Sequence, residues 1–312
     1  MKSAQSYGAR RALLVCFFCS AWLAACGGGG GRDPILGIGG SGSGSGVNAI
    51  APVAVVPASI LGSASRFGIF GGSAGMTNTG VNTVITGSSG ATADIGTTAT
   101  GTTSITGFHD SAPSDVYTET GANVGNVTGK IYTCTTSTTG PSSATVNAAS
   151  CTVATAARAD VLTAYNFLVA LPAGPNPGAG NLANLTLVPG VYTAAAGSFK
   201  MEGGNLTLDA QGNPDAVWVF QMATTLTVGG PGAAAPQSVI LAGGAQSKNV
   251  YWQVGSAATI NAGGGGTMIG TIISQAGTAV STVGNAALTA INGRVLSLGA
   301  SVTVVNTAIT AP

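Results

Sequence analysis

Charged and aromatic residues are scarce in this chain. Of its 312 residues, 6% are charged and 5% are aromatic, whereas average soluble domains carry about 25% charged residues. With a formal net charge of +1, there is no basic stripe that could bind nucleic acid. The scarcity does not indicate disorder, because 45% of the residues are hydrophobic and disordered chains usually have low hydrophobicity. A folded all-β chain built from small residues fits this composition better.

Side chains that could perform catalysis are equally few. The single histidine, His109, precedes Asp110, and such a pair is more often a satisfied structural contact than a dyad. Asp209 and Asp215 flank a turn sequence. The glycine run at 263–266 lacks the Lys and Ser/Thr of a phosphate-binding loop. No pair of carboxylates suits acid–base work, and no cysteine or histidine spacing suits a metal. We therefore expect no enzyme and no cofactor.

The N-terminus is a targeting segment. Basic residues precede the apolar run 12–22, which is too short to span a membrane as a mature helix. Residues 23–26, Leu-Ala-Ala-Cys, resemble the lipobox of bacterial lipoproteins. That resemblance implies a signal peptide over 1–25, a lipid on Cys26 and export, and Gly27 in place of Asp favours the outer membrane or cell surface. The alternative is an ordinary signal peptide that happens to contain a cysteine.

A glycine- and serine-rich linker separates this segment from the folded part. We place the linker at 26–57, since Gly/Ser-rich sequence behaves as a flexible coil. The domain then extends over 58–312. Once the signal and Cys26 are set aside, Cys134 and Cys151 remain, and a disulfide between them is permitted in an oxidising compartment. Two free buried thiols are the alternative.

The C-terminal half repeats one pattern, an apolar strand, a small-residue corner and a threonine-rich strand. The repeats lie at 217–227, 250–260, 270–281 and 293–303. A period of about 20 residues with glycine corners is typical of one rung of a parallel β-solenoid. A β-sandwich is the alternative, but no Asn-Gly or Asp-Gly hairpin turn joins the strands.

One segment departs from the β pattern. Residues 154–171 have apolar positions at helical spacing and end before Pro172, which predicts an amphipathic helix along the solenoid. The preceding stretch, 108–152, has no rung repeat and contains both remaining cysteines. We interpret it as an inserted cap stapled by the disulfide.

A series of short strings occurs along the chain in a fixed order: Leu61–Ala64, Phe67–Gly72, Thr77–Gly80, Val84–Gly87, Ile105–Phe108, Leu187–Tyr192, Leu206–Ala210, Ala216–Gln221, Asn249–Ser256 and Ile291–Arg294. No single string is specific, but the ordered set, over about residues 59–310, resembles the bacterial ice-binding family. The resemblance implies an irregular right-handed β-helix with a long helix alongside, in some members with a cap insertion.

The resemblance also implies a ligand, the surface of an ice crystal, and a flat face of regularly spaced Thr and Ser that binds it. Outward residues that recur at one place in the repeat are the best candidates, with Thr278 and Thr303 near the middle. Family members often show a Thr-Ala/Gly-x-Thr/Asn pattern, which residues 100–103 match. The candidates are Thr225, Thr259, Thr278, Thr282, Ser301, Thr303, Thr100 and Thr102.

The alternative is that the outward threonines only make the β surface soluble and bind no ligand. The chain would then be a surface adhesin or structural module that contacts another extracellular surface. In either case we expect a monomer that touches the membrane only through its lipid anchor.

Overall fold

The computed structural model describes residues 51–111, 116–140 and 144–312. The predicted signal peptide, the Cys26 lipid site and most of the predicted linker lie outside these residues. Within the described residues, no helix has the length and apolar character needed to cross a membrane. The domain belongs to one compact unit, Asn48–Pro312.

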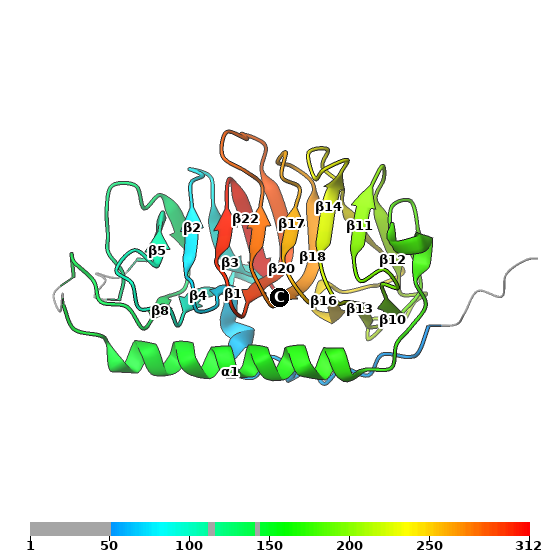
Figure 1. Ribbon diagram of the computed structural model, residues 1–312, viewed down its shortest axis with the longest axis horizontal. Coiled ribbons are helices and arrows are strands. Elements are labelled where there is room, and N and C mark those ends of the chain that lie inside the picture. The colour runs from blue at the N-terminus through cyan, green and yellow to red at the C-terminus, as the bar shows by residue number, and fades with distance from the viewer. Residues whose placement is uncertain (1–50, 112–115, 141–143) are drawn as a thin grey trace, which may run out of the picture. The chain divides into compact units, whose positions relative to one another are not determined.

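The strands stack into a parallel solenoid (Figure 1). The first sheet contains β10 (Gly190–Thr193), β13 (Trp218–Met222), β16 (Val250–Val254), β18 (Thr267–Ser274), β20 (Thr289–Ser297), β22 (Thr307–Ala311), β3 (Val84–Gly87), β7 (Gly125–Val127), β6 (Phe108–His109), β1 (Phe67–Gly71), β4 (Asp94–Thr97) and β8 (Ile131–Thr133). The second contains β11 (Phe199–Glu202), β14 (Leu226–Gly230), β17 (Ala258–Ile260), β19 (Thr278–Val280), β21 (Val302–Val304), β2 (Met76–Asn78) and β5 (Ile105–Thr106). The third contains β15 (Val239–Ala242), β12 (Leu206–Asp209) and β9 (Thr186–Leu187).

Each rung contributes to three faces. The long strands β18 and β20 bend between two of them, since β16 and β1 pair with their C-terminal halves while β22 pairs with the N-terminal half of β20. We call the side of β10, β13, β16, β1 and β4 the helix-covered face. The side made by the second sheet is the threonine face, and the side of β12, β15, β22 and β3 is the third face. The strand pairings are parallel, which confirms the predicted solenoid and excludes a hairpin sandwich.

Large side chains fill the interior between the faces. The Phe220 ring stacks on Trp252 at a centroid distance of 4.0 Å and lies 5.6 Å from Tyr192. The indole N–H of Trp252 donates to Ile269 O and that of Trp218 to Leu187 O. Each buried aromatic side chain stabilises the fold by roughly 1.5–3 kcal/mol, and stacking rungs buries an apolar column that one rung could not bury alone.

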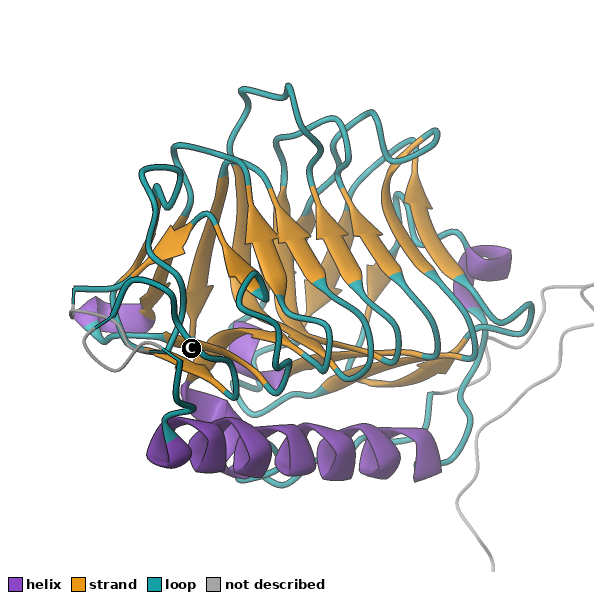
Figure 2. Cartoon of the chain, turned by 60° about the vertical axis from the view of Figure 1, so that its left-hand side comes forward, coloured by secondary structure: helices purple, strands orange, loops and turns teal. Residues whose placement is uncertain are grey.

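Helix α1 (Ala148–Ala170) lies along the stack of rungs, as Figures 1 and 2 show. It begins six residues before the predicted start because the Asn147 side chain accepts a hydrogen bond from Ser150 N, an N-cap. Its buried stripe packs on outward residues of the helix-covered face such as Val219 and Ile273. Gln221 Nε2 donates to the Leu168 carbonyl at the end of the helix. Short one-turn helices occur at η1 (Gly62–Arg66), η2 (Ser88–Gly90), η3 (Pro177–Gly180) and η4 (Ser247–Asn249).

The structure corrects the description of 108–152 as a cap without rungs. Strand β7 pairs with β3 and β8 pairs with β4, so this segment extends the solenoid. Its strands have two or three residues each, too few for alternation to be visible in the sequence. The predicted disulfide is present: Cys134, just after β8, is bonded to Cys151 in the first turns of α1, with 4.3 Å between the Cα atoms.

The folded domain also begins earlier in the chain than predicted. Residues 51–57, predicted as linker, pack on the domain: Ala51 and Ala54 are buried, and Val191 N donates to Pro52 O over 3.0 Å. At the same end, Leu182 N donates to Lys200 O and Glu202 N donates to Asn181 Oδ1, so a loop covers the edge of β11. Covered edges cannot pair with a strand of another chain.

Candidate functional site

A column of threonines crosses the threonine face. Alternation along each strand sends every second side chain outward, and the outward residues of neighbouring strands are direct partners in the ladder. In stacking order they are Lys200, Thr227, Thr259, Ala279, Thr303, Thr77 and Thr106. Neighbouring members are about 4.7–4.9 Å apart, the spacing of hydrogen-bonded strands. At one end, Thr106 Oγ1 donates to Thr77 Oγ1 over 3.0 Å.

A second column of small residues lies beside the first, two positions earlier in each rung, at the residue just before each strand begins. Its members follow one another from rung to rung, because the N–H of the residue after one member donates to the carbonyl of the next member: Leu226 N donates to Ala257 O, for example, and Thr278 N to Ser301 O. No member of this column is larger than threonine, and the first column exceeds threonine only at Lys200, so the two columns together form a strip of small side chains apart from that end. The column consists of Ser198, Thr225, Ala257, Gly277, Ser301, Gly75 and Ser104.

Charge is confined to one end of this strip. Lys200 Nζ and Glu202 Oε2 form an ion pair at 2.6 Å on the outermost strand, β11. The hydrogen bond from Lys200 holds the pKa of the Glu202 carboxyl below its ordinary value. Every other member of the two columns is Thr, Ser, Ala or Gly. The strip therefore offers methyl and hydroxyl groups, and its only titratable group is Lys200, at the end.

Four of the eight predicted residues lie in these columns: Thr225, Thr259, Ser301 and Thr303. They are exposed or half-buried. Whether they bind a ligand stays a prediction.

The outward placement of Thr278 is wrong. This residue is 2% exposed, and its hydroxyl shares a hydrogen bond with Ser274 Oγ over 3.0 Å. Thr278 pairs with Ala258 and Val302, whose side chains are also buried, so Ala279 faces outward in its place. The predicted alternation was out of phase by one residue, which reverses the face of every side chain in a strand.

Three further predicted residues lie away from the strip. Thr282 follows the end of β19, and its hydroxyl donates to Ala262 O on the neighbouring rung over 2.7 Å. Thr100 and Thr102 lie in the turn between β4 and β5. Sequence reasoning missed Thr227, Thr77 and Thr106. The signal for the last two was present in the strings Gly-Met-Thr (75–77) and Ser-Ile-Thr (104–106), which resemble Ser-Val-Thr (301–303).

Several acidic and basic groups elsewhere have structural partners. Asp110 accepts a hydrogen bond from Ile131 N over 2.9 Å, so the residue beside His109 helps to hold β8 in place. Arg66 pairs with Asp94 and also donates to Tyr132 OH. In the part of the chain that the structure describes, no three His, Cys, Asp or Glu side chains cluster as a metal site would require.

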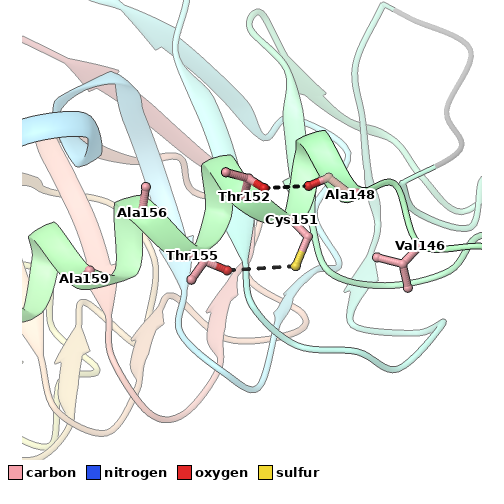
Figure 3. A pocket seen from close by; sticks show the side chains of 7 residues that line it. All are labelled: Val146, Ala148, Cys151, Thr152, Thr155, Ala156 and Ala159. Atoms are coloured by element: carbon pink, nitrogen blue, oxygen red, sulfur yellow. Dashed lines mark hydrogen bonds between the residues drawn. The ribbon is translucent and has the colours of Figure 1, made fainter.

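A shallow pocket lies at the start of α1 (Figure 3). Alanines and threonines of the helix line it together with Val146 and Cys151. Thr152 Oγ1 donates to Ala148 O, so this hydroxyl is already used within the helix. Cys151 is in the disulfide, and the lining therefore contains no ionisable side chain.

The fold and the strip define a class: a parallel β-solenoid whose one face is sealed by a helix and whose neighbouring face presents flat rows of threonine. The family model described as "Ice-binding-like" matches residues 70–310, so the chain belongs to this family.

The relatives in this family are ice-binding proteins. An ice-binding protein of Nostoc sp. (strain HG1) is 37% identical over 205 residues, covering 66% of this chain and 58% of the relative. Ice-binding protein 1 of Shewanella frigidimarina is 42% identical over 120 residues, 36% of this chain and 12% of the relative. The matches thus span less than two thirds of either relative. The crystal structure of an ice-binding protein from the Antarctic ascomycete Antarctomyces psychrotrophicus is 32% identical with a TM-score of 0.58, covering 81% of this chain and 97% of that one.

Proposed function

We propose that this chain binds ice through its threonine face and performs no catalysis. The observation that carries the proposal is the strip of two columns in register, uncharged except at its β11 end. The names of the relatives support ice as the ligand, and the partners of the acidic groups speak against acid–base work.

The physical basis is a match between a rigid protein surface and ordered water. Each threonine supplies a methyl and a hydroxyl group on one side chain whose χ1 is stiff. Rows repeat about every 4.7–4.9 Å across the strands and roughly every 6.5–7 Å along them, so water held by the strip has a regular lattice. A charged group would orient water around itself instead, and the centre of the strip has none.

Binding to a surface in this way sums many weak contacts and requires flatness more than any single group. The expected consequence is inhibition of ice growth or recrystallisation, or adhesion of the cell to ice. The chain should act as a monomer, since loops cover the edge of β11 and residues 51–57 cover that of β10.

The test uses residues 27–312, without the signal peptide and the lipid site. We expect thermal hysteresis and inhibition of ice recrystallisation at micromolar protein. If a folded sample shows neither effect, ice binding is wrong, and the alternative of a surface adhesin or structural module on the same fold is favoured.

We further propose that the protein is exported and anchored by a lipid on Cys26 at the cell envelope, in the outer membrane or at the cell surface. The Leu-Ala-Ala-Cys string at 23–26 and the glycine-rich stretch after it support this placement. Changing Cys26 to Ala should release the protein from the membrane fraction. Wild-type protein that is already soluble and cleaved at another position would contradict the lipid anchor.

A further inference from the structure

Large apolar side chains are exposed on two loops at the edge of the threonine face. The loops at 79–83 and 281–288, which we call the corner loops, connect strands of the threonine face to strands of the third face. Val81 is 71% exposed on the first, and Val283 and Leu288 are 79% and 49% exposed on the second. Single exposed apolar residues need no explanation, but these occur together along one edge.

The two valines occupy equivalent places. Val81 follows Asn78, the last residue of β2, by three positions, and Val283 follows Val280, the last residue of β19, by three positions. Strand β21 lies between β19 and β2 in the sheet, so the loops are two rungs apart, roughly 9–10 Å along the stack. The rung between them turns its corner without a loop, at Val305 and Asn306. The corner loops therefore stand as two parallel ridges.

Hydrogen bonds from side chains brace both ridges. Asn306 lies between them: Asn82 N donates to its Oδ1 over 3.2 Å, and its Nδ2 donates to Asn285 O over 2.7 Å. The Thr282 hydroxyl ties the second loop to Ala262 O on the rung beyond. Asn78 Nδ2 holds the first loop through Gly80 O. Such bonds fix the positions of the exposed valines relative to the strip.

The corner loops carry no charge. Neither contains Asp, Glu, Lys or Arg, and the adjacent loop at 261–266 contains none either. They continue the uncharged centre of the strip directly, because each begins at the end of one of its strands. The corner thus shares two properties with the threonine face, positions held by hydrogen bonds and the absence of charge, and adds larger methyl-bearing side chains.

We infer that the corner loops form a second ice-contacting facet, inclined to the threonine face and continuous with it. This inference rests on the proposed function and extends it: the two facets together engage crystal planes that the strip alone would not. The methyl groups of Val81 and Val283 would lie against the lattice on one side of the edge while the threonine columns lie against it on the other.

The test places a charge on each ridge without touching the strip. The double variant Val81→Asp with Val283→Asp is compared with wild type and with Val169→Asp, which alters a 50% exposed valine on the outer side of α1. Fluorescently labelled residues 27–312 are bound to single ice crystals to record which planes they stain, and thermal hysteresis is measured on the same samples. Melting temperatures are measured to check that all the variants are folded.

We expect the double variant to stain fewer planes than wild type, with a several-fold loss of hysteresis and an unchanged melting temperature. The Val169→Asp control should behave as wild type. If the double variant stains the same planes with the same hysteresis as wild type, the second facet is wrong while ice binding stands. Wild-type protein that stains no plane would instead overturn the proposed function itself.

Discussion

The threonine face and the third face are built from the same rungs, yet their surfaces differ. The threonine face presents two columns in which no side chain exceeds threonine until the Lys200 end. On the third face, the register places Ile240 beside Thr207, Asn292 beside Thr310 and Asn126 beside Val84. Solenoid geometry gives both faces the same spacing, so spacing alone does not make a binding surface. The restriction to small uncharged side chains distinguishes the threonine face.

The largest expected effect comes from adding bulk to the middle of the strip. Thr303→Tyr should abolish most thermal hysteresis, because one raised side chain lifts the flat face from the lattice. The melting temperature should change little, since Thr303 is exposed and its replacement removes no core packing.

Its matched control is Thr310→Tyr, which places the same bulk at an outward position of the third face. The control should retain nearly all of the hysteresis. If only Thr310→Tyr loses activity, the third face binds ice in place of the threonine face. If the two variants lose activity equally, the assignment of binding to the threonine face is wrong.

Removing the disulfide should lower the stability of the protein without weakening its binding to ice. The bond closes a loop over a sequence separation of 17 residues, worth about 3 kcal/mol in the chain-entropy model. We expect Cys134→Ser with Cys151→Ser to lower the melting temperature and to speed amide hydrogen exchange in β8 and the start of α1. Hysteresis near 0 °C should persist, because neither cysteine lies on the strip. Unreduced tryptic peptides that carry two free thiols in the wild type would contradict the bond itself.

The smallest expected effect is a gain. Ala279 interrupts the threonine column between Thr259 and Thr303. Ala279→Thr would make that part of the column continuous, and we expect a modest rise in hysteresis at equal protein concentration. Ala308→Thr makes the same chemical change on the third face and should have no effect. A gain from both variants would indicate that added hydroxyls help wherever they lie.

Much of the fold could be predicted because its signals are local and repeated. The helix at 148–170 shows helical spacing and ends before Pro172, and the C-terminal rungs repeat visibly in the sequence. Which side chains of a three-residue strand face inward is harder to predict. In β19, Thr278 and Ala279 are both small, and Val280 is the one residue of the strand whose apolar side chain indicates which positions face inward. The structure decides it through the ladder partners of Thr278.

Thr77 and Thr106 were missed for a topological reason. Strand β2 stacks on one side on β5, which follows it in the chain, and on the other side on β21, more than 220 residues away. The column is continuous in space and broken in sequence, so a comparison of successive repeats cannot assemble it. Only an alignment of the first rungs with the last would have placed residues 77 and 106 after 303.

The same topology places the first and the last strands of the chain side by side in the middle of the stack. The strand partners β20–β1, β21–β2 and β22–β3 join the last rung of the chain to the first. Most solenoids can nucleate at one place and grow rung by rung from neighbours in sequence. Here the longest unbroken strip forms only after loop closure over nearly the whole chain, and contacts of such high sequence separation slow folding. A nascent chain would therefore carry two short, separate surfaces, and an extended surface for ice would appear only in the last step of folding.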